Sequence, residues 1–339
     1  MDQTTRTFLN TPIEIGGRPI ENRLVLAPMS GLGNVAFREL LAEYGGPGLM
    51  FMEMCSARSI PQENRYVSPV FRWVDAELSR LVCQIFGDSP EDMAAAARRI
   101  EKEGFFGVDL NFGCSVARIC KRNCGAALLK SPDQAVSIVR AVREAVDFPV
   151  FVKFRTGWTD APAPAVTLAR GFEAAGADAL TFHPRVAPDR RARPPKWAYI
   201  ADVKSAVSIP VFGNGNVFSA ADGEAMLLKT GCDGVALGRG AIARPWVFSE
   251  ILQGRSFGPE SYVKMLNRLI DLLAAHYDEI LALRRFRKTA VYVAAYFRYG
   301  HVFNKRLRKA VDLDDLRKRV NEFLQTPPEL SVQPNLNFF

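Results

Sequence analysis

A strand-like segment that ends in a loop rich in cysteine is the part of this sequence best suited to chemistry. Residues 108–110 run into Asn111, and the loop that follows carries three cysteines, Cys114, Cys120 and Cys124. In α/β barrels, a strand end of this kind presents a reactive group at the top face. The alternative is a buried strand followed by a turn whose cysteines only fill space, since free cysteine is often buried.

Functional side chains also stand at the ends of the other expected strands. They are Pro28 and Met29, Glu53, Gln84, Lys153 and Arg155, His183 and Arg185, Asn214, and Arg239. Two glycine-flanked turns, 213–215 and 238–240, follow the last two strands, where barrels commonly bind phosphate. Backbone N–H groups beside glycine can approach phosphate oxygens, and Arg239 adds a charge-assisted fork. Each turn alone is weak evidence, but the pair indicates a phosphate site.

Lys153 lies in the alternating run 151–155 and is expected to point into the barrel mouth. Its ammonium group needs an anionic partner there, because an unpaired buried charge is costly. A reduced flavin ring or a phosphate would supply that charge. A salt bridge to a barrel carboxylate such as Glu53 is the alternative. His183 ends another apolar run and is expected to contact the same cofactor, although a lone histidine is commonly structural.

Strand-like and helical segments alternate along the first 255 residues. Strands are expected at residues 24–27, 49–52, 81–86, 107–111, 150–154, 179–182, 211–213 and 234–237. Helices are expected at residues 35–44, 90–103, 132–145, 165–175, 197–206 and 220–229. Ser89 and Ser131 each precede a proline, as an N-cap does. Alternation predicts parallel pairing, and eight units favour a closed (β/α)8 TIM barrel of the α/β class over a doubly wound sheet.

The pattern changes near residue 255, where the strand-like segments stop. Apolar residues at helical spacing then recur in the segments 262–283, 286–299 and 313–324. This predicts a C-terminal helical bundle domain appended to the barrel. We expect a catalytic barrel over residues 1–255, the helical domain over 256–325, and a frayed, proline-rich tail over 326–339.

Composition and charge narrow the classes of function. The 339 residues are 48% hydrophobic and 24% charged, and no apolar run approaches the about 20 residues that span a bilayer. The N-terminus lacks signal-peptide features, and six cysteines without secretory features favour a reducing cytoplasm. The net charge is +8, and residues 284–319 carry twelve Lys or Arg against three Asp and no Glu. That excess accounts for the whole surplus and indicates a polyanionic partner.

Six motifs, taken together and in order, resemble the tRNA-dihydrouridine synthases. They are LAPMSGLGNVAFREL from residue 26, VDLNFGCSVARICKRNCGAALL from 108, VKFRTGW from 152, LTFHPR from 180, VFGNGNV from 211 and GVALGRGAIARPWVF from 234. The resemblance extends over about residues 24–320. The basic segment 283–288 is also similar to the RNA-binding domain of that family.

The resemblance implies a flavoprotein oxidoreductase with an FMN-binding (β/α)8 barrel. Such enzymes reduce the C5–C6 double bond of selected uridines in tRNA and take electrons from NADPH. The residues that the resemblance places at the flavin are Pro28, Met29, Ser30, Gln84, Asn111, Lys153 and His183. Those that it places at the FMN phosphate are Asn214, Gly215, Asn216, Gly238 and Arg239. It places Cys114 at the catalytic acid.

In that role, Cys114 delivers a proton to C5 of uracil while a hydride reaches C6. A free thiol, with a pKa of about 8.5, is mostly protonated at neutral pH yet acidic enough to donate to an enolate-like carbon. Departures from the family pattern occur at Ser115, where proline is usual, at Ser30, where Glu or Ala is commoner, and at Pro184, where glycine is usual. None removes a reacting group, but Ser115 stiffens the loop less than proline would.

Cys114, Cys120 and Cys124 form a C-x5-C-x3-C array, which is a weak signal for metal binding. Zinc requires a fourth ligand and is typically held by close CxxC pairs. We therefore predict no metal site. A disulfide within the loop is a further alternative.

An RNA substrate requires a basic surface and extrusion of the target base into a pocket. We expect that surface on the C-terminal helices and on the loop 188–196, which adds four cations. The residues expected to bind RNA are Arg185, Arg190, Arg191, Arg284, Arg285, Arg287 and Lys288. Tyr292, Tyr296 and Tyr299 are interleaved with these cations, although tyrosines also suit a helical core.

We therefore predict a cytoplasmic FMN- and NADPH-dependent enzyme that forms 5,6-dihydrouridine in tRNA. No membrane association and no obligate protein partner are expected. One alternative is an FMN-dependent reductase of a small molecule, of ene-reductase or dihydroorotate-dehydrogenase type, for which the basic tail has no use. Others are the same chemistry on ribosomal RNA, or flavin or RNA binding without turnover.

Overall fold

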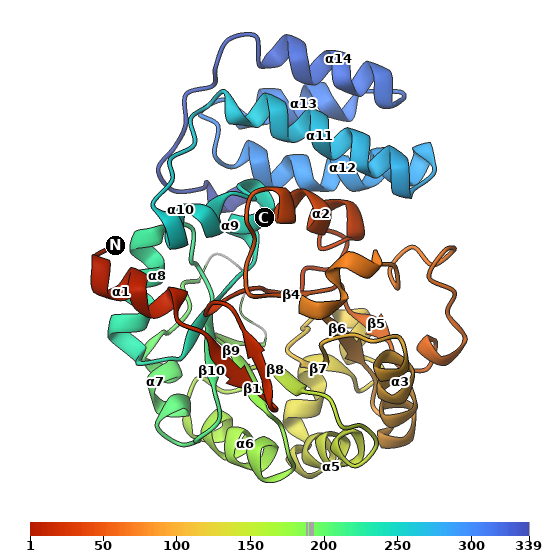
Figure 1. Ribbon diagram of the computed structural model, residues 1–339, viewed down its shortest axis with the longest axis vertical. Coiled ribbons are helices and arrows are strands. Elements are labelled where there is room, and N and C mark those ends of the chain that lie inside the picture. The colour runs from red at the N-terminus through yellow and green to blue at the C-terminus, as the bar shows by residue number, and fades with distance from the viewer. Residues whose placement is uncertain (188, 190–192, 339) are drawn as a thin grey trace.

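The computed structural model describes residues 1–187, 189 and 193–338, and it shows a barrel beneath a layer of helices (Figure 1). Arg190 and Arg191, two of the residues expected to bind RNA, lie outside the described residues. Within the described ranges, no helix combines the length and the apolar character needed to cross a bilayer.

In the described chain, eight parallel strands close into a barrel. They are β3 (Leu24–Leu26), β4 (Leu49–Phe51), β6 (Leu81–Phe86), β7 (Gly107–Phe112), β8 (Val150–Gly157), β9 (Ala179–Val186), β10 (Val211–Asn214) and β11 (Gly234–Leu237). The ring closes because β3 pairs with β11 and β4 pairs with β6. The short β5 (Cys55–Ser56) pairs in parallel with Ile85 and Phe86 at the end of β6. The predicted (β/α)8 barrel is confirmed, and the doubly wound alternative is wrong.

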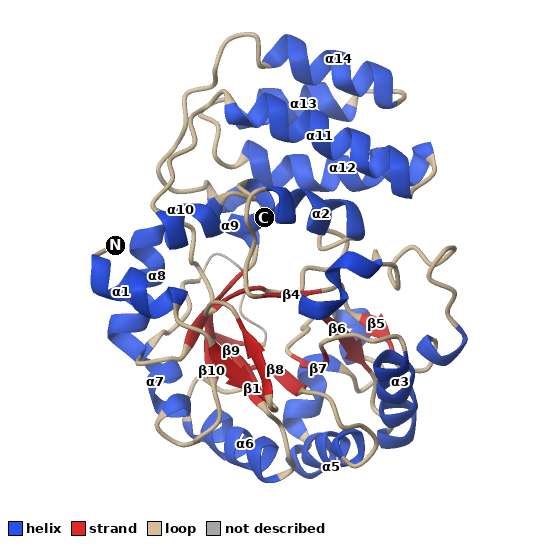
Figure 2. Ribbon diagram, in the orientation of Figure 1, coloured by secondary structure: helices blue, strands red, loops and turns tan. Residues whose placement is uncertain are grey.

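Helices surround the strands, as the colouring in Figure 2 shows. They are α1 (Gln3–Asn10), α2 (Val35–Glu43), α3 (Pro90–Lys102), α4 (Ala117–Cys120), α5 (Pro132–Arg143), α6 (Ala163–Ala174), α7 (Ala198–Lys204), α8 (Ala220–Thr230), α9 (Arg239–Ala243) and α10 (Val247–Gln253). Short 3-10 helices lie at η1 (Ile60–Gln62), η2 (Asp75–Arg80), η3 (Gly125–Lys130) and η4 (Leu336–Phe338). Ser89 caps α3 by accepting from Asp92 N at 3.1 Å, whereas Ser131 begins α5 without a side-chain cap bond.

Aromatic and aliphatic side chains fill the lower barrel. The antiparallel hairpin of β1 (Ile13–Ile15) and β2 (Arg18–Ile20) packs its isoleucines against interior residues of the barrel. Phe51 and Phe151, whose strands are not neighbours in the ring, meet at 5.3 Å between ring centroids. Because these side chains fill the barrel interior toward the amino-terminal ends of the strands, a ligand site must lie at the carboxyl ends.

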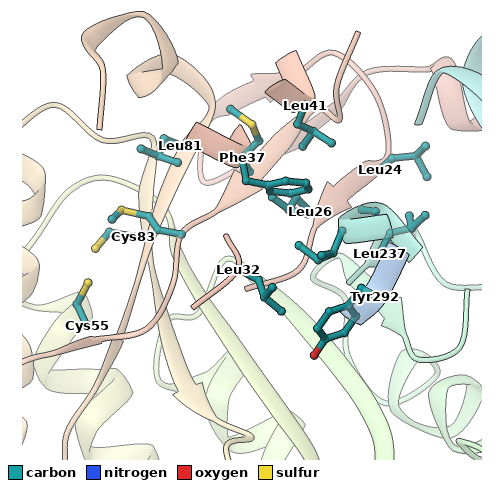
Figure 3. Close-up of a cluster of buried hydrophobic side chains, with 14 of the residues drawn as sticks. Leu24, Leu26, Leu32, Phe37, Leu41, Cys55, Leu81, Cys83, Leu237 and Tyr292 are labelled. Carbon is teal, nitrogen blue, oxygen red and sulfur yellow. The ribbon is translucent and has the colours of Figure 1, made fainter. Parts of the chain in front are cut away.

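A second core joins the strands to the outer helices (Figure 3). Leu24 and Leu26 of β3 lie beside Phe37 and Leu41 of α2, and all four are buried. Tyr292 belongs to the same buried cluster, although it comes from the C-terminal helices. This continuity shows that the helical layer shares its core with the barrel.

The C-terminal layer consists, in the described residues, of α11 (Ser261–His276), α12 (Glu279–Ala294), α13 (Gly300–Arg308) and α14 (Leu313–Phe323). It contacts the barrel through α2 and α9, which lie at the boundary in Figure 1. The expected helix 262–283 is wrong at its end, because Asp278 caps a new helix by accepting from Leu281 N at 2.9 Å. The helix α13 was not expected as a separate element.

The described part of the C-terminal tail is bound to the helices, so the expectation of a frayed segment is wrong. Arg298 N donates to Glu329 O at 3.0 Å, Ser331 N to Tyr296 O at 2.8 Å, and Asn335 N to Ala295 O at 2.8 Å. Two of these bonds satisfy the carbonyls of Ala295 and Tyr296, directly after α12, and the third satisfies a carbonyl of the tail. The division into domains at residues 255 and 325 stays a prediction.

Candidate active site

A cavity of about 320 Å³ opens at the carboxyl ends of the strands. It is lined by Cys114 and by every residue expected at the cofactor: Pro28, Met29, Ser30, Gln84, Asn111, Lys153, His183, Asn214, Gly215, Asn216, Gly238 and Arg239. Parallel strands end at one rim, so residues far apart in the sequence converge there. The helix α12 adds Lys288 and Tyr292 to the wall.

Asn111, at the end of β7, organises the start of the cysteine loop. Its Oδ1 accepts from Gly113 N at 3.1 Å and from Cys114 N at 2.9 Å. Its Nδ2 donates to Gln84 Oε1 at 2.8 Å, and Gln84 Nε2 donates to Asp109 Oδ2 at 2.6 Å. This chain of hydrogen bonds, built on neighbouring strands β6 and β7, sets where the Cys114 backbone leaves the barrel.

The far end of the loop is held against Cys114 as well. Cys114 O accepts from Ala126 N at 2.9 Å and from Cys120 Sγ at 3.5 Å. Gly125 has φ +63°, and a Cβ at that position would lie 2.6 Å from Cys114 O, so the close approach requires glycine. The partly buried thiol is therefore held at the cavity even though Ser115 replaces the usual proline.

The other cysteines of the array do not extend this site. All six cysteines of the chain are free thiols, so the alternative of a disulfide in the loop is not realised here. Cys124 Sγ donates to Arg122 O at 3.1 Å, and burial raises the pKa of this thiol to about 11. Among the described residues, no group of three or more His, Cys, Asp or Glu is arranged to hold a metal ion.

Lys153 on β8 acts with Asp109 rather than with Glu53. Burial, followed by the nearby Arg155 charge, lowers the pKa of Lys153 to about 8, and the Asp109 charge opposes this shift. Burial raises the pKa of Asp109 to about 7. Glu53 does not fill the alternative role of a barrel carboxylate beside Lys153, because it pairs with Arg285 at 2.8 Å. The carboxylate whose charge acts on Lys153 is Asp109.

His183 on β9 is held in its neutral form. Burial lowers its pKa well below the ordinary value, and the charges of Arg155 and Lys153 add to the effect. Its buried Nε2 has no hydrogen-bond partner among the described residues. A neutral imidazole with an unsatisfied ring nitrogen suits a hydrogen bond to a bound ligand.

Two guanidinium groups converge beyond the ends of β9 to β11. Asn216 Oδ1 accepts from Arg239 Nη2 at 2.7 Å and from Arg185 Nη2 at 3.1 Å. Gly215 has φ +124°, and a Cβ there would lie 3.0 Å from the His183 ring. Two cations sharing one neutral amide oxygen beside a bare stretch of backbone form a suitable site for an anion such as phosphate.

The charged side chains described in the cavity wall all carry positive charge. Among the described lining residues there is no carboxylate, and six side chains are basic: Arg118, Lys153, Arg155, Arg185, Arg239 and Lys288. Arg118, Tyr292 and Met54 were not expected at the site. The sequence offered a signal for two of them. Arg118 is a charged residue in the loop after Cys114, and Tyr292 stands four positions after Lys288, on the same face of a helix.

The residues expected to bind RNA divide into different environments. Arg284 and Lys288 of α12 are exposed, whereas Arg287 is half-buried and donates to Ala310 O. Arg285 is only 6% exposed and forms its ion pair with Glu53 in the interior. The expectation that Arg285 faces RNA is therefore corrected, and Arg185 lies inside the cavity beside Arg239 rather than on the outer surface.

The fold and site together define a (β/α)8 barrel protein with a basic cavity that carries a thiol. Residues 25–327 match the family model described as Dihydrouridine synthase (Dus). The chain belongs to this family, as the six motifs indicated.

Curated relatives resemble nearly the whole chain. A probable tRNA-dihydrouridine synthase of Mycobacterium tuberculosis is 35% identical over 322 residues, 90% of this chain and 82% of the relative. The tRNA-dihydrouridine synthase B of Pseudomonas putida is 33% identical over 88% of this chain and 90% of the relative. Morphinone reductase in complex with tetrahydroNAD has a TM-score of 0.52 and 16% identity over 74% of this chain and 91% of that chain. That likeness shows the barrel fold alone.

Proposed function

We propose that this protein is a cytoplasmic tRNA-dihydrouridine synthase that uses FMN and is reduced by NADPH. The family supports the reaction, and the basic cavity supports the cofactor. The observation that carries the proposal is the gathering of a thiol and all twelve expected cofactor residues around one cavity.

The residues of the cavity fit FMN. Arg185 and Arg239 converge where a phosphate dianion would bind, and the bare backbone at Gly215 allows close approach. The unsatisfied His183 Nε2 can bond to the flavin ring or its ribityl chain, and Lys153 would stabilise negative charge on the pyrimidine end of the flavin. FMN held by these residues would supply the hydride that C6 of uracil receives.

The protein's own residues then position the base and complete the reduction. Hydride addition at C6 places negative charge toward C5 and O4, and Cys114 delivers a proton to C5. The hydrogen bonds of Asn111 and Ala126 fix both ends of the loop that carries this thiol. Orientation of this kind contributes much of the rate of reactions between bound groups. The exposed Arg284 and Lys288 would hold the RNA backbone as one base enters the cavity.

Replacement of the proposed acid tests this mechanism. In Cys114→Ala, the purified protein should remain yellow, while dihydrouridine formation falls by at least about 100-fold, the contribution expected of general acid catalysis. The measurement is dihydrouridine content after single-turnover reaction with transfer RNA from a strain that lacks this protein. Cys124→Ala, which removes a thiol of the same loop that bonds to Arg122 O and does not line the cavity, should retain activity.

Two results would count against the proposal. Full activity in Cys114→Ala would remove Cys114 from the mechanism. Loss of dihydrouridine from ribosomal RNA but not from transfer RNA in the same deletion strain would reassign the substrate.

A further inference from the structure

Charged side chains from different elements hold the turn 28–33, which forms one wall of the cavity. Gly33 O accepts from Arg38 Nη1 at 2.7 Å, and Ser30 O accepts from Lys288 Nζ at 2.5 Å. Gly31 N donates to Glu53 Oε2. Within the turn, Met29 O accepts from Leu32 N at 3.0 Å and from Gly33 N at 2.9 Å. The remaining polar groups, Gly31 N, Ser30 O and Gly33 O, are satisfied by these outside partners, which therefore help to set the conformation of the turn.

Glu53 connects this turn to the C-terminal helical layer. While its Oε2 accepts from Gly31 N, its Oε1 accepts from Arg285 Nη1 of α12 at 2.8 Å. Glu53 is 3% exposed and Arg285 is 6% exposed. The Arg285 guanidinium also donates to Pro69 O and lies 4.6 Å from the centroid of the Tyr277 ring. The carboxylate therefore depends on a partner 232 positions away in the sequence.

The same helix reaches the cavity directly. Lys288 and Tyr292 of α12 are four positions apart, so they lie on one face of the helix, and both line the cavity. In Figure 3, the Tyr292 ring lies near Leu32, which belongs to the turn, and Leu237, the last residue of β11. The helix that carries Arg285 is thus part of the wall around the cofactor site.

We propose that Arg285 is a positioning residue of the cofactor site, holding the turn 28–33 in its ligand-binding conformation through Glu53. This inference rests on the proposed function only in naming FMN as the ligand. Without Arg285, Glu53 is a buried carboxylate that has lost its ion-pair partner, a state that is strongly disfavoured. It relaxes by taking up a proton or turning toward water, and either change weakens its bond to Gly31 N. Arg285 thereby links the layer proposed to bind RNA to the flavin.

The matched control is a second ion pair between the helical layer and the barrel. Arg268 of α11 pairs with Glu43 of α2 at 2.6 Å, and its partner does not contact the turn. Both side chains are nearly half exposed, so loss of this pair should have little effect. Arg268→Gln removes a cation from the same interface without changing Glu53.

The experiment measures the full-length apo-protein in two ways, by FMN fluorescence titration and by hydrogen exchange of the Gly31 amide. Arg285→Gln should raise the Kd for FMN about tenfold, equivalent to about 1.4 kcal/mol. It should also speed exchange at Gly31, whereas Arg268→Gln should change the Kd by less than about twofold. If Arg285→Gln does not fold by circular dichroism, Arg285→Lys carries the test, with a smaller loss because the charge is kept.

A folded Arg285 variant with wild-type FMN affinity and wild-type Gly31 exchange would overturn the inference. Equal weakening by Arg268→Gln would overturn it too, because the effect would then belong to the interface as a whole. A wild-type protein that binds no FMN would defeat the proposed function instead. The Gly31 exchange rate, which needs no flavin, would still decide whether Arg285 positions the turn.

Discussion

At the scale of single residues, the site is governed by ionisable groups whose charges are disfavoured by burial. Asp109 and Lys153 lie on adjacent strands beneath the cavity, and burial moves their pKa values toward each other, to about 7 and about 8. His183 stays neutral among cations. A bound anion would stabilise the charged form of Lys153, and perturbed groups of this kind are typical of functional sites.

The raised pKa of Asp109 predicts how stability depends on pH. Between its ordinary value of 3.8 and about 7, the folded apo-protein keeps a proton that the unfolded chain releases. The folded state therefore binds more protons, and the free energy of unfolding falls as the pH rises through this window. Urea denaturation at a series of pH values should show this fall, and Asp109→Asn should flatten it. An unchanged slope in the variant would contradict the assignment.

The lowered pKa of His183 predicts that its ring stays neutral near pH 7. In proton NMR of the apo-protein, the imidazole resonance that disappears in His183→Gln should not titrate with a midpoint near the ordinary value of about 6.5. Burial and the Arg155 and Lys153 charges oppose protonation. A midpoint at or above that value would show that the ring is solvated.

At the scale of elements, the break between α11 and α12 sets the position of the α12 residues. Tyr277 ends α11 in extended backbone, and Asp278 begins α12 as its N-cap. A continuous helix over this segment would rotate and shift Arg285 and Lys288 away from their partners. The cap thus supports the site from a distance of two to three helical turns.

Removal of this cap should destabilise the protein by about 1 kcal/mol, because an orphan N–H of α12 loses its acceptor. The change is Asp278→Ala, and the measurement is the free energy of unfolding in urea. Asp314→Ala, in the first turn of α14 but not at its N-cap position, is the control and should cost less. Equal losses in the two variants would show that the capping bond contributes nothing.

At the scale of the whole molecule, the exposed cations of the helical layer form its basic surface. They include Arg284 and, on or beside α13, Lys305, Arg306, Arg308 and Lys309. Several other cations of the segment are already paired, such as Arg317 with Asp271 and Arg319 with Asp315. Tyr296 is buried and Tyr292 faces the cavity, so Tyr299, at 60% exposed, is the tyrosine of the three that lies on this outer surface.

Neutralising part of this surface should weaken RNA binding in a salt-dependent way. Combining Arg284→Gln, Lys305→Gln and Arg308→Gln should reduce the slope of log affinity against log salt by about 0.7 to 0.9 per lost phosphate contact. The measurement is filter binding of transfer RNA at several salt concentrations. Arg140→Gln on α5, at the far end of the barrel in Figure 1, is the control. If the triple variant and the wild type showed the same slope, the RNA would bind on another surface.

The sequence alone determined the barrel and the set of residues at its rim. Strand-length apolar segments alternate with helical segments, and the carboxyl ends of parallel strands meet at one edge. Gln84, Lys153 and Asn214 could therefore be placed together from the sequence. Local signals also located the loop of Cys114. Each of these inferences uses residues close in sequence or a rule that any closed parallel barrel obeys.

Only the tertiary structure decided which charges pair and which face the ligand. The basic segment of α12 shows a charged helix, but its rotation, set by packing against the barrel, buries Arg285 on Glu53 and leaves Arg284 exposed. In the sequence, Asp109 is only one residue of a predicted strand. Its pKa depends on its burial and on Gln84 and Lys153, which the fold brings beside it. Partners of this kind lie tens to hundreds of positions apart, and burial, which sets their energy, is a property of the assembled fold.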